Sequence, residues 1–255
     1  MIKTDLAGDL KRLRLPAMAD NLDLRAREAE EAKLGYIEFA ALLVQDELAN
    51  RETNSFQKRL KAAGVTSRMT FETFDYDFNS VVLQPQIVRD LASCRFIEQR
   101  RNLVIAGPPG IGKSHIAQAL GHEAARRGLD VVVFKTSKLL ERLTPDRLSA
   151  KRTQLLMKRC LSAGLLILDD FAFRPYSQLD TELLYTLSDE RLGIASIIVT
   201  SNRPPEDWFS VFPDSIVGGA IMDRLVSGAV KLIVTSGRSY RKEGVHGQQA
   251  EQVPA

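Results

Sequence analysis

One stretch of the chain places glycines, a lysine and a serine at a spacing suited to binding phosphate. Four apolar residues, 103–106, lead into GPPGIGKS, which fits the G-x-x-x-x-G-K-[ST] pattern of a phosphate-binding loop. Lys113 is placed to reach the β- and γ-phosphates of a nucleotide, and Ser114 offers a hydroxyl to Mg²⁺. We therefore expect an ATP site with Mg²⁺ whose binding residues are Gly107, Pro108, Pro109, Gly110, Ile111, Gly112, Lys113, Ser114 and His115.

The sequence around this loop predicts the two elements that a phosphate loop needs. The apolar run before it has the length of a buried strand. After it, Ile116, Leu120 and Ala124 recur at helical spacing, and Gly128 is placed to end that helix. The N-terminal end of such a helix would turn its partial positive charge toward the phosphates. A chance glycine-rich turn remains the alternative, but it would not explain a strand, a loop and a helix in register.

Two acids follow a second apolar run and predict the metal side of the site. Asp169 and Asp170 come directly after residues 165–168, so their side chains are expected at the carboxyl edge of a parallel sheet. Asp169 is the candidate Mg²⁺ ligand beside Ser114, and Asp170 is the candidate residue that polarises the attacking water. Alternatively, Asp169 caps the next segment, and Asp170 only orients its neighbour.

Three further polar residues are candidates for the same chemistry. Asn202 ends another apolar run and could hold the water in line, although the sequence NRPP is also a favourable turn. Arg224, in IMDRL, could stabilise charge on the γ-phosphoryl group of a neighbouring subunit, or could form an ordinary ion pair with Asp223. Arg241 is a further candidate contact to the nucleotide. The expected catalytic set is therefore Lys113, Asp170, Asn202 and Arg224.

The arrangement of apolar patterns predicts two folded domains and a tail. Residues 1–70 read as a small all-helical domain, with Gly64 closing its last helix. Residues 71–242 alternate short apolar runs with helical segments, which indicates an α/β fold with a five-stranded parallel sheet between helices. Residues 243–255 contain few core-forming side chains and read as a disordered tail. The expected strands are residues 103–106, 131–134, 165–168, 196–200 and 230–234.

A linker between the two domains alternates aromatic and polar side chains. Phe71, Phe74, Tyr76 and Phe78 fit a strand-like arm that packs on the second domain, or a wall of an adenine pocket. Residues 84–96 then read as one helix that leads into the first strand.

Composition excludes several classes of protein. The 255 residues are 44% hydrophobic and 26% charged, and no apolar run is long enough for a membrane span. The first residues lack the apolar core of a signal peptide, so we expect none. Two distant cysteines, Cys94 and Cys160, suggest a reducing compartment, and we expect a cytoplasmic protein. Three histidines form no ligand set, so a zinc site is not expected. The net charge of +3 weakly favours a polyanionic partner.

Four motifs taken together resemble those of a known family. GPPGIGKS, LLILDD, TSNRP and MDRL occur in this order, and the set resembles the AAA+ ATPases of the P-loop class. It resembles more closely the IstB-type helper ATPases of insertion sequences and their relatives, the DnaC-type helicase loaders. The N-terminal LKRLRLPAMADNLD is also similar to the opening of IstB-type proteins.

This resemblance implies a function. Such proteins form homo-oligomers with ATP sites shared between subunits, bind duplex DNA with little sequence preference, and assist a transposase in inserting DNA. Two departures from the general AAA+ pattern stand out. Asp170 occupies a position where many members have glutamate, and the chain after the fifth strand is too short for a full helical lid. Arg241 is expected to replace the lid's arginine.

The basic residues that could contact DNA cluster between the second and third expected strands. Residues 138–159 contain seven basic and two acidic side chains, interleaved with leucines that suit a packed face. An ordinary solvated basic face is the alternative. The N-terminal arm of Lys11, Arg12 and Arg14 is a second candidate, for DNA or for the partner enzyme.

Two other functions fit parts of the pattern. A replicative helicase loader would have the same ATPase domain, but its N-terminal domain would bind a helicase ring. A small-molecule kinase of the P-loop class would need an arginine-rich lid after the third strand, where this chain has residues 171–175 and then an ordinary helix.

Overall fold

The structure is a computed structural model that describes residues 5–66, 68–144 and 150–243. The chain divides into two compact units, residues 1–58 and 59–255. Of the tail expected from residue 243 onward, only Glu243 belongs to the described residues.

The first unit is helical, as the apolar spacing predicts. Asp5 caps its first helix by accepting the N–H of Gly8, and Pro16 occupies the first turn of the second helix, where its missing N–H costs nothing. The buried side chains are few and small, among them Leu10, Ala19 and Leu43. The helices are α1 (Leu6–Arg12), α2 (Pro16–Glu31) and α3 (Tyr36–Ala63), the last of which ends in the second unit.

Polar contacts fix α2 against α3 in this unit. Arg25 forms two hydrogen bonds to the carboxylate of Asp46, at 2.6 and 2.8 Å, and this guanidinium holds the pKa of Asp46 below its ordinary value. The nearly buried Glu47 accepts the N–H of Ala17 at 2.9 Å and pairs with Arg51. A unit with so small an apolar core depends on such contacts for its packing.

The second unit is built on a five-stranded parallel sheet, which confirms the expected fold class. The strand order is β2-β3-β4-β1-β5, so the first strand lies near the middle of the sheet. Every residue of β1, β3 and β4 is buried, as continuous apolar strands covered on both faces should be. The strands are β1 (Leu103–Ala106), β2 (Val131–Lys135), β3 (Leu165–Asp169), β4 (Ser196–Ser201) and β5 (Val230–Ile233).

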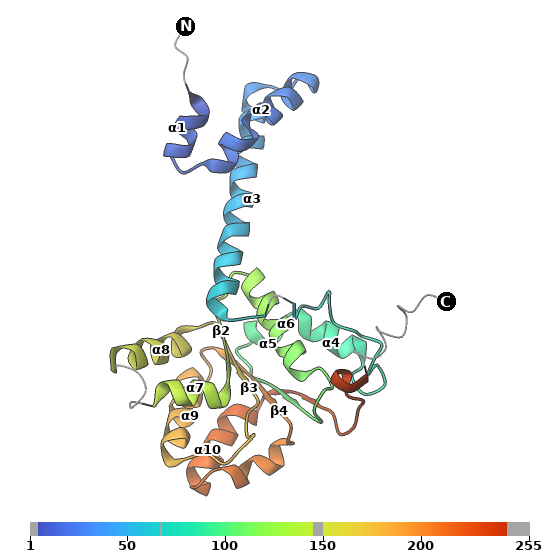
Figure 1. Ribbon diagram of the computed structural model, residues 1–255, viewed down its shortest axis with the longest axis vertical. Helices are drawn as coiled ribbons and strands as arrows, with labels where there is room; N and C mark the ends of the chain where they lie inside the picture. Colours follow the sequence, from blue (N-terminus) through green and yellow to red (C-terminus); the bar gives the residue numbers. More distant parts are fainter. Residues whose placement is uncertain (1–4, 67, 145–149, 244–255) are drawn as a thin grey trace. The chain divides into compact units, whose positions relative to one another are not determined.

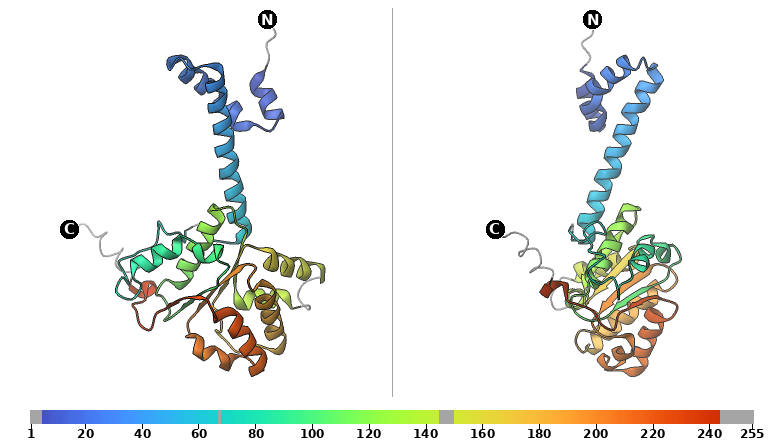
Figure 2. Two further views of the ribbon diagram at one scale, coloured as in Figure 1. Left: turned by 180° about the vertical axis from the view of Figure 1, so that it is seen from behind. Right: turned by 90° about the vertical axis from the view of Figure 1, so that its right-hand side faces the viewer.

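Helices cover both faces of this sheet (Figures 1 and 2). One layer contains α4 (Pro85–Ala92), α5 (Arg95–Glu98) and α6 (Lys113–Arg126), with α6 packed directly on the strands. The opposite layer packs around an apolar core that includes Phe171 and Trp208. Its elements are α7 (Thr136–Leu143), α8 (Ala150–Ser162), α9 (Gln178–Arg191), η2 (Pro205–Val211) and α10 (Ser215–Val226).

The register of the sheet brings four strand ends to one edge. Ala106 of β1 lies beside Ser201 of β4, and Lys135 of β2 lies beside Asp169 of β3. Because all strands are parallel, the residues that follow them share this carboxyl edge, where open α/β sheets bind their ligands.

Two local expectations are corrected by the structure. The helix expected over residues 84–96 is broken at Cys94, whose φ of +56° separates α4 from α5. Residues 71–78 form bends and turns rather than a strand-like arm. The Asp75 carboxylate accepts the N–H groups of Asp77 and Phe78, so a local turn satisfies backbone donors that a strand would pair across a sheet.

The boundary between the units differs from the residue 70 expected from the sequence. The chain that follows residue 58 is bound to α6 of the second unit. Arg59 Nε donates to the carbonyl of Ala125, and the N–H of Thr66 donates to Gln118 Oε1, both at 2.9 Å. These contacts place the last turn of α3 and the start of the linker with the sheet-containing unit. Among the described residues, no helix has the length and apolar character needed to cross a membrane.

Candidate nucleotide-binding site

The loop between β1 and α6 has a backbone that requires glycine. Gly110 and Gly112 have φ values of +84° and +105°, and Gly112 directly precedes α6. A Cβ on Gly110 would lie 2.2 Å from Ser239 Oγ, so a side chain would also displace its neighbour. The loop and the N-terminus of α6 therefore present backbone N–H groups to one place, where both favour an anion.

Lys113 supplies the positive charge of this loop. Its ammonium group donates to the carbonyls of Gly107 and Pro108, each at 2.8 Å. Burial, together with the positive charge of Arg241, lowers the pKa of Lys113 to about 8, while Asp170 and Asp169 oppose this shift. A phosphate bound beside this buried ammonium group would stabilise its charged form, because the negative charge offsets the cost of burial.

Ser114 and Asp169 meet behind the loop as expected of a magnesium site. Ser114 Oγ donates to Asp169 Oδ1 at 2.8 Å, and Thr200 Oγ1 donates to the same oxygen at 2.5 Å. The hydroxyl of Thr136 donates to the backbone carbonyl of Asp169 at 2.9 Å. A hydroxyl and a carboxylate are hard oxygen ligands, so Ser114 and Asp169 would suit a Mg²⁺ ion.

Asp170 turns away from the strand to face the same edge. Its φ of +54° ends β3, and its N–H donates to Thr200 Oγ1 at 3.1 Å. Its carboxylate forms an ion pair of 2.9 Å with Lys135, the last residue of β2. Asp170 thus lies on the solvent side of the strand ends, where a water-polarising group would be needed.

A cavity of about 250 Å³ opens in front of these groups. Its walls come from the loop and α6, from the linker after α3, and from the chain after β5. The expected residues that line it are Pro109, Gly110, Ile111, Gly112, Lys113, Ser114, His115, Asp170, Asn202 and Arg241. Its remaining lining is mostly aromatic or apolar and includes Phe74, Tyr76, Phe78 and Tyr240. A polar end beside an aromatic wall is the shape that a nucleotide requires.

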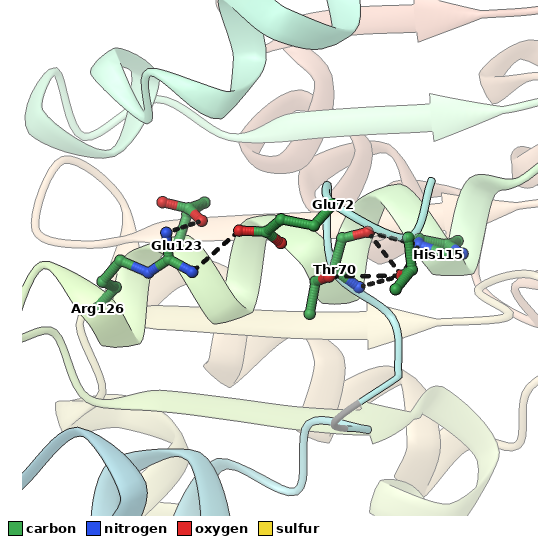
Figure 3. Close-up of polar contacts among 6 residues, drawn as sticks. Thr70, Glu72, His115, Glu123 and Arg126 are labelled. Atoms are coloured by element: carbon green, nitrogen blue, oxygen red, sulfur yellow. Dashed lines mark hydrogen bonds and ion pairs between the residues drawn. The ribbon is translucent and has the colours of Figure 1, made fainter. Parts of the chain in front are cut away.

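The linker wall is bound along α6 (Figure 3). His115 Nε2 lies 2.8 Å from the carbonyl of Thr70, and the His115 ring makes an edge contact with Phe74 at 5.2 Å. Further along α6, Arg126 pairs with Glu72 at 3.2 Å and with Glu123 at 3.3 Å. The segment that carries the aromatic side chains therefore has a defined position beside the phosphate loop.

The structure brings most of the expected site residues together, but four of them lie outside the cavity lining. Gly107, Pro108 and Asp169 lie beneath the cavity lining, where they hold Lys113 and Ser114. Arg224 lies outside the lining, on α10, and contacts α9 of the same chain. Its Nε donates to Asp189 at 2.7 Å, and its guanidinium lies 4.8 Å from the Tyr185 ring.

Sequence reasoning missed two residues that organise the acids. Thr200 is buried and touches both Asp169 and Asp170, and Lys135 pairs with Asp170. A hydroxyl near the end of the apolar run SIIVT was the available signal for Thr200, and a lysine closing the run VVVF was the signal for Lys135. Neither residue belongs to a spacing pattern that would identify it.

The basic segment expected over residues 138–159 divides into α7 and α8, with Arg147 outside the described residues. Lys138 pairs with Glu141, and Arg142 lies over the Phe134 ring. On α8, Lys151, Arg152 and Lys158 are exposed, whereas the side chain of Arg159 donates to the carbonyl of Ala62. The exposed cations of this segment therefore lie mainly on α8.

Comparison with known proteins identifies a family of similar sequences. A sequence profile of the family described as IstB-like ATP binding protein matches residues 8–247. An ATP-binding protein of an insertion sequence in Mycobacterium tuberculosis is 38% identical over 92% of this chain and 93% of its own length. The ATP-binding protein of insertion sequence IS21 in Pseudomonas aeruginosa is 32% identical, over 91% and 86%.

Solved structures show the same fold at lower identity. The replication initiator DnaA bound to AMPPCP and single-stranded DNA matches with a TM-score of 0.57 and 21% identity, over 73% of this chain and 56% of that one. The DnaC helicase loader matches with a TM-score of 0.55 and 21% identity, over 67% of this chain and all of that one. Both are similar in architecture, and the phosphate loop, the paired acids and the cavity described above occur on that architecture here.

Proposed function

The chain belongs to the family of IstB-like ATP-binding proteins, which have the AAA+ P-loop fold, and we propose that it is a Mg²⁺-dependent ATPase that binds duplex DNA and assists a transposase. One observation carries the ATPase part of this proposal. Ser114, Asp169 and Thr200 form a continuous set of hydrogen bonds directly behind Lys113 and the phosphate loop. These are the groups that a Mg²⁺–triphosphate complex requires.

The side chains of this site divide the work of hydrolysis. Lys113 binds the β- and γ-phosphates. Ser114 and Asp169 would hold Mg²⁺, which would supply positive charge to the reacting phosphate. Asp170 accepts a proton from the attacking water, and Asn202 orients that water. Holding these groups in fixed positions supplies most of the acceleration in phosphoryl transfer. Arg224 of a neighbouring subunit completes the charge stabilisation in a homo-oligomer.

The DNA part of the proposal is supported by the exposed cations of α8. Lys151, Arg152 and Lys158 carry no acidic partner among the ion pairs that the described residues form, and such side chains bind phosphates without reading sequence.

The relatives' place in insertion sequences supports a transposase as the protein partner. In the first unit, Tyr36, Ile37 and Leu48 are exposed apolar side chains that suit a protein surface. The free thiols Cys94 and Cys160 fit a cytoplasmic protein.

Phosphate release in the presence and absence of duplex DNA tests this function. We expect ATP turnover that needs Mg²⁺, needs no added acceptor, and rises when DNA is supplied. Lys113→Ala should abolish nucleotide binding, whereas Asp170→Asn should retain binding and lose turnover. A kinase would consume ATP only with an acceptor, and that result would exclude the proposed activity.

The partner is tested separately, with the full chain as bait. Capture of an insertion-sequence transposase supports the proposal. Capture of a replicative helicase ring instead would identify the chain as a helicase loader.

A further inference from the structure

The chain after β5 returns across the phosphate loop. Residues 237–243, here called the C-terminal strap, contact the loop at Gly110, whose carbonyl accepts the N–H of Tyr240 at 2.9 Å. Ser239 fills the space that a side chain on Gly110 would need. The strap therefore lies against the loop that is proposed to bind the phosphates.

Asn79 holds this strap from the side of the linker. Its amide donates to the carbonyl of Arg238 at 3.0 Å and accepts the N–H of the same residue at 3.0 Å. Asn79 is 8% exposed, so these two bonds are shielded from water. A paired donor and acceptor fix both the position and the direction of the strap, which a single hydrogen bond would not do.

Aromatic contacts beside Asn79 strengthen the same attachment. The Phe78 ring makes an edge contact with Tyr240 at 5.0 Å, and the guanidinium of Arg238 lies 4.6 Å from the centre of the Phe78 ring. Arg238 also pairs with Glu243 at 2.6 Å within the strap. Asn79 and Phe78 together form a clasp, the name used for this pair below.

The clasped strap carries two side chains into the cavity. Tyr240 and Arg241 line it together with Lys113, Asp170 and Asn202, the residues assigned to the γ-phosphate end. Arg241 forms no side-chain hydrogen bond or ion pair within residues 5–66, 68–144 and 150–243, so its charge is available to a ligand. Two cations that converge on one cavity favour a multiply charged anion.

We propose that Asn79 is a positioning residue that holds Arg241 over the phosphate loop, so that the strap distinguishes ATP from ADP. This inference rests on the proposed ATPase function. A strap held in place before binding adds its contact to the γ-phosphate without having to be ordered first. Release of the strap would leave the phosphate loop intact. The affinity for ATP would therefore fall more than the affinity for ADP.

Equilibrium binding of ATP and ADP to the full chain tests the proposal, with a fluorescent ATP analogue as the displaced probe. Asn79→Ala should weaken ATP binding about tenfold and ADP binding less than threefold, and Arg241→Ala should do the same. The double variant should bind ATP no more weakly than Arg241→Ala alone, because the clasp acts through that arginine. A merely structural residue would reduce both affinities together and would be additive with Arg241→Ala.

Asn102→Ala is the matched control. Its amide also joins backbone groups, the carbonyl of Arg224 and the N–H of Ile197, but at the opposite end of β1. It should lower the thermal midpoint without changing the ratio of ATP to ADP affinity. If Asn79→Ala does not fold, Phe78→Leu replaces it, and the same shift in the ratio is expected.

Three results would overturn the inference. These are an unchanged affinity ratio in the clasp variants, a ratio changed equally by Asn102→Ala, and a multiplied loss in the double variant. Failure of the unaltered chain to bind either nucleotide is a separate outcome, which would overturn the proposed ATPase function and the clasp with it.

Discussion

At the scale of single residues, Thr200 sets the relation between the two acids of the site. One hydroxyl donates to Asp169 Oδ1 and accepts the N–H of Asp170, so it joins the proposed metal ligand to the proposed water-polarising residue. Thr200 is 1% exposed, and water cannot replace either bond. Its removal would leave the N–H of Asp170 without a partner at the point where the chain turns with positive φ.

Replacing Thr200 with valine keeps the shape of the side chain and removes only this hydroxyl. We expect the maximal rate of ATP hydrolysis to fall at least about tenfold, because Asp169 and Asp170 lose their common hydrogen-bonding partner. Nucleotide binding should change less than about threefold, since the phosphate loop is untouched. The free energy of unfolding should fall by about 1–3 kcal/mol, the usual cost of an unpaired buried polar group. Phosphate release and urea unfolding measure the two effects.

Thr186→Val is the control for this substitution. That hydroxyl donates to the carbonyl of Glu182 within its own helix, away from the site, so its loss should leave turnover unchanged. Turnover by Thr200→Val at the rate of the unaltered protein would show that the hydroxyl does not organise the acids.

Which residues the sequence could predict depends on how local their signal is. Lys113, Ser114 and Asp169 were predicted together because a loop pattern and an acid at a strand end each have a meaning that needs no other part of the chain. Thr200 acts through contacts to another strand, and such contacts leave no spacing in the sequence. Arg224 lies in the recognisable motif MDRL, but the sequence could not show that Arg224 pairs with Asp189 of the same chain.

At the scale of elements, apolar runs predicted the five strands to within a residue or two, because each strand is buried on both faces or lies beside one that is. The linker was harder. Its aromatic residues alternate like a strand, yet Asp75 bonds two backbone N–H groups locally and turns the chain. The alternating aromatic side chains Phe74, Tyr76 and Phe78 instead form part of the cavity wall. An alternation of side chains every second residue indicates a strand only where the backbone can form hydrogen bonds to a neighbouring strand.

Helix α8 offers a test of the proposed DNA contact at this scale. Lys151→Glu combined with Arg152→Glu should weaken duplex binding at least about tenfold at moderate salt. It should also reduce the dependence of log affinity on log salt by roughly two, one for each phosphate contact removed. ATP affinity should remain within about twofold, because neither residue lines the cavity. Titration of labelled duplex at several salt concentrations measures both quantities.

The N-terminal arm provides the comparison for α8. Lys11 and Arg12 pair with Asp20 and Asp9, which leaves their charge partly neutralised, and reversing both should affect duplex binding little. Loss of binding in this arm variant but not in the α8 variant would move the contact to the first unit. Equal loss of ATP and DNA binding in the α8 variant would show a folding defect instead.

At the scale of the whole molecule, charge and exposure differ between the two units. Residues 1–58 contain nine lysines and arginines against eleven acids, a formal charge of −2, and the remaining residues carry +5. A polyanion would therefore be attracted more strongly to the second unit than to the first. The first unit, with its exposed apolar side chains on α3, is better suited to a protein partner. Under the proposed function, this division would place the DNA contact and the transposase contact in different parts of one chain.

A subunit-mixing experiment tests whether ATP sites are shared between chains. Arg224 is held by Asp189 and Tyr185 outside its own cavity, so any contact of Arg224 with a nucleotide must be with that of a neighbour. Arg224→Ala should leave ATP binding unchanged and lower the rate of hydrolysis by about a hundredfold or more, as expected for an arginine supplied in trans. Lys113→Ala should be inactive for the opposite reason, since it supplies the arginine but cannot bind the nucleotide.

Mixing these two inactive variants in equal amounts should restore activity. About a quarter of the interfaces would then pair an intact loop from one chain with an intact Arg224 from the other, so we expect up to about a quarter of the unaltered rate. A double variant, Lys113→Ala with Arg224→Ala, is the control, because it supplies neither half and should restore nothing. Sedimentation must show that each variant still assembles. A mixture no more active than its components, in oligomers of normal size, would exclude a trans role for Arg224 and leave each chain to hydrolyse its own nucleotide.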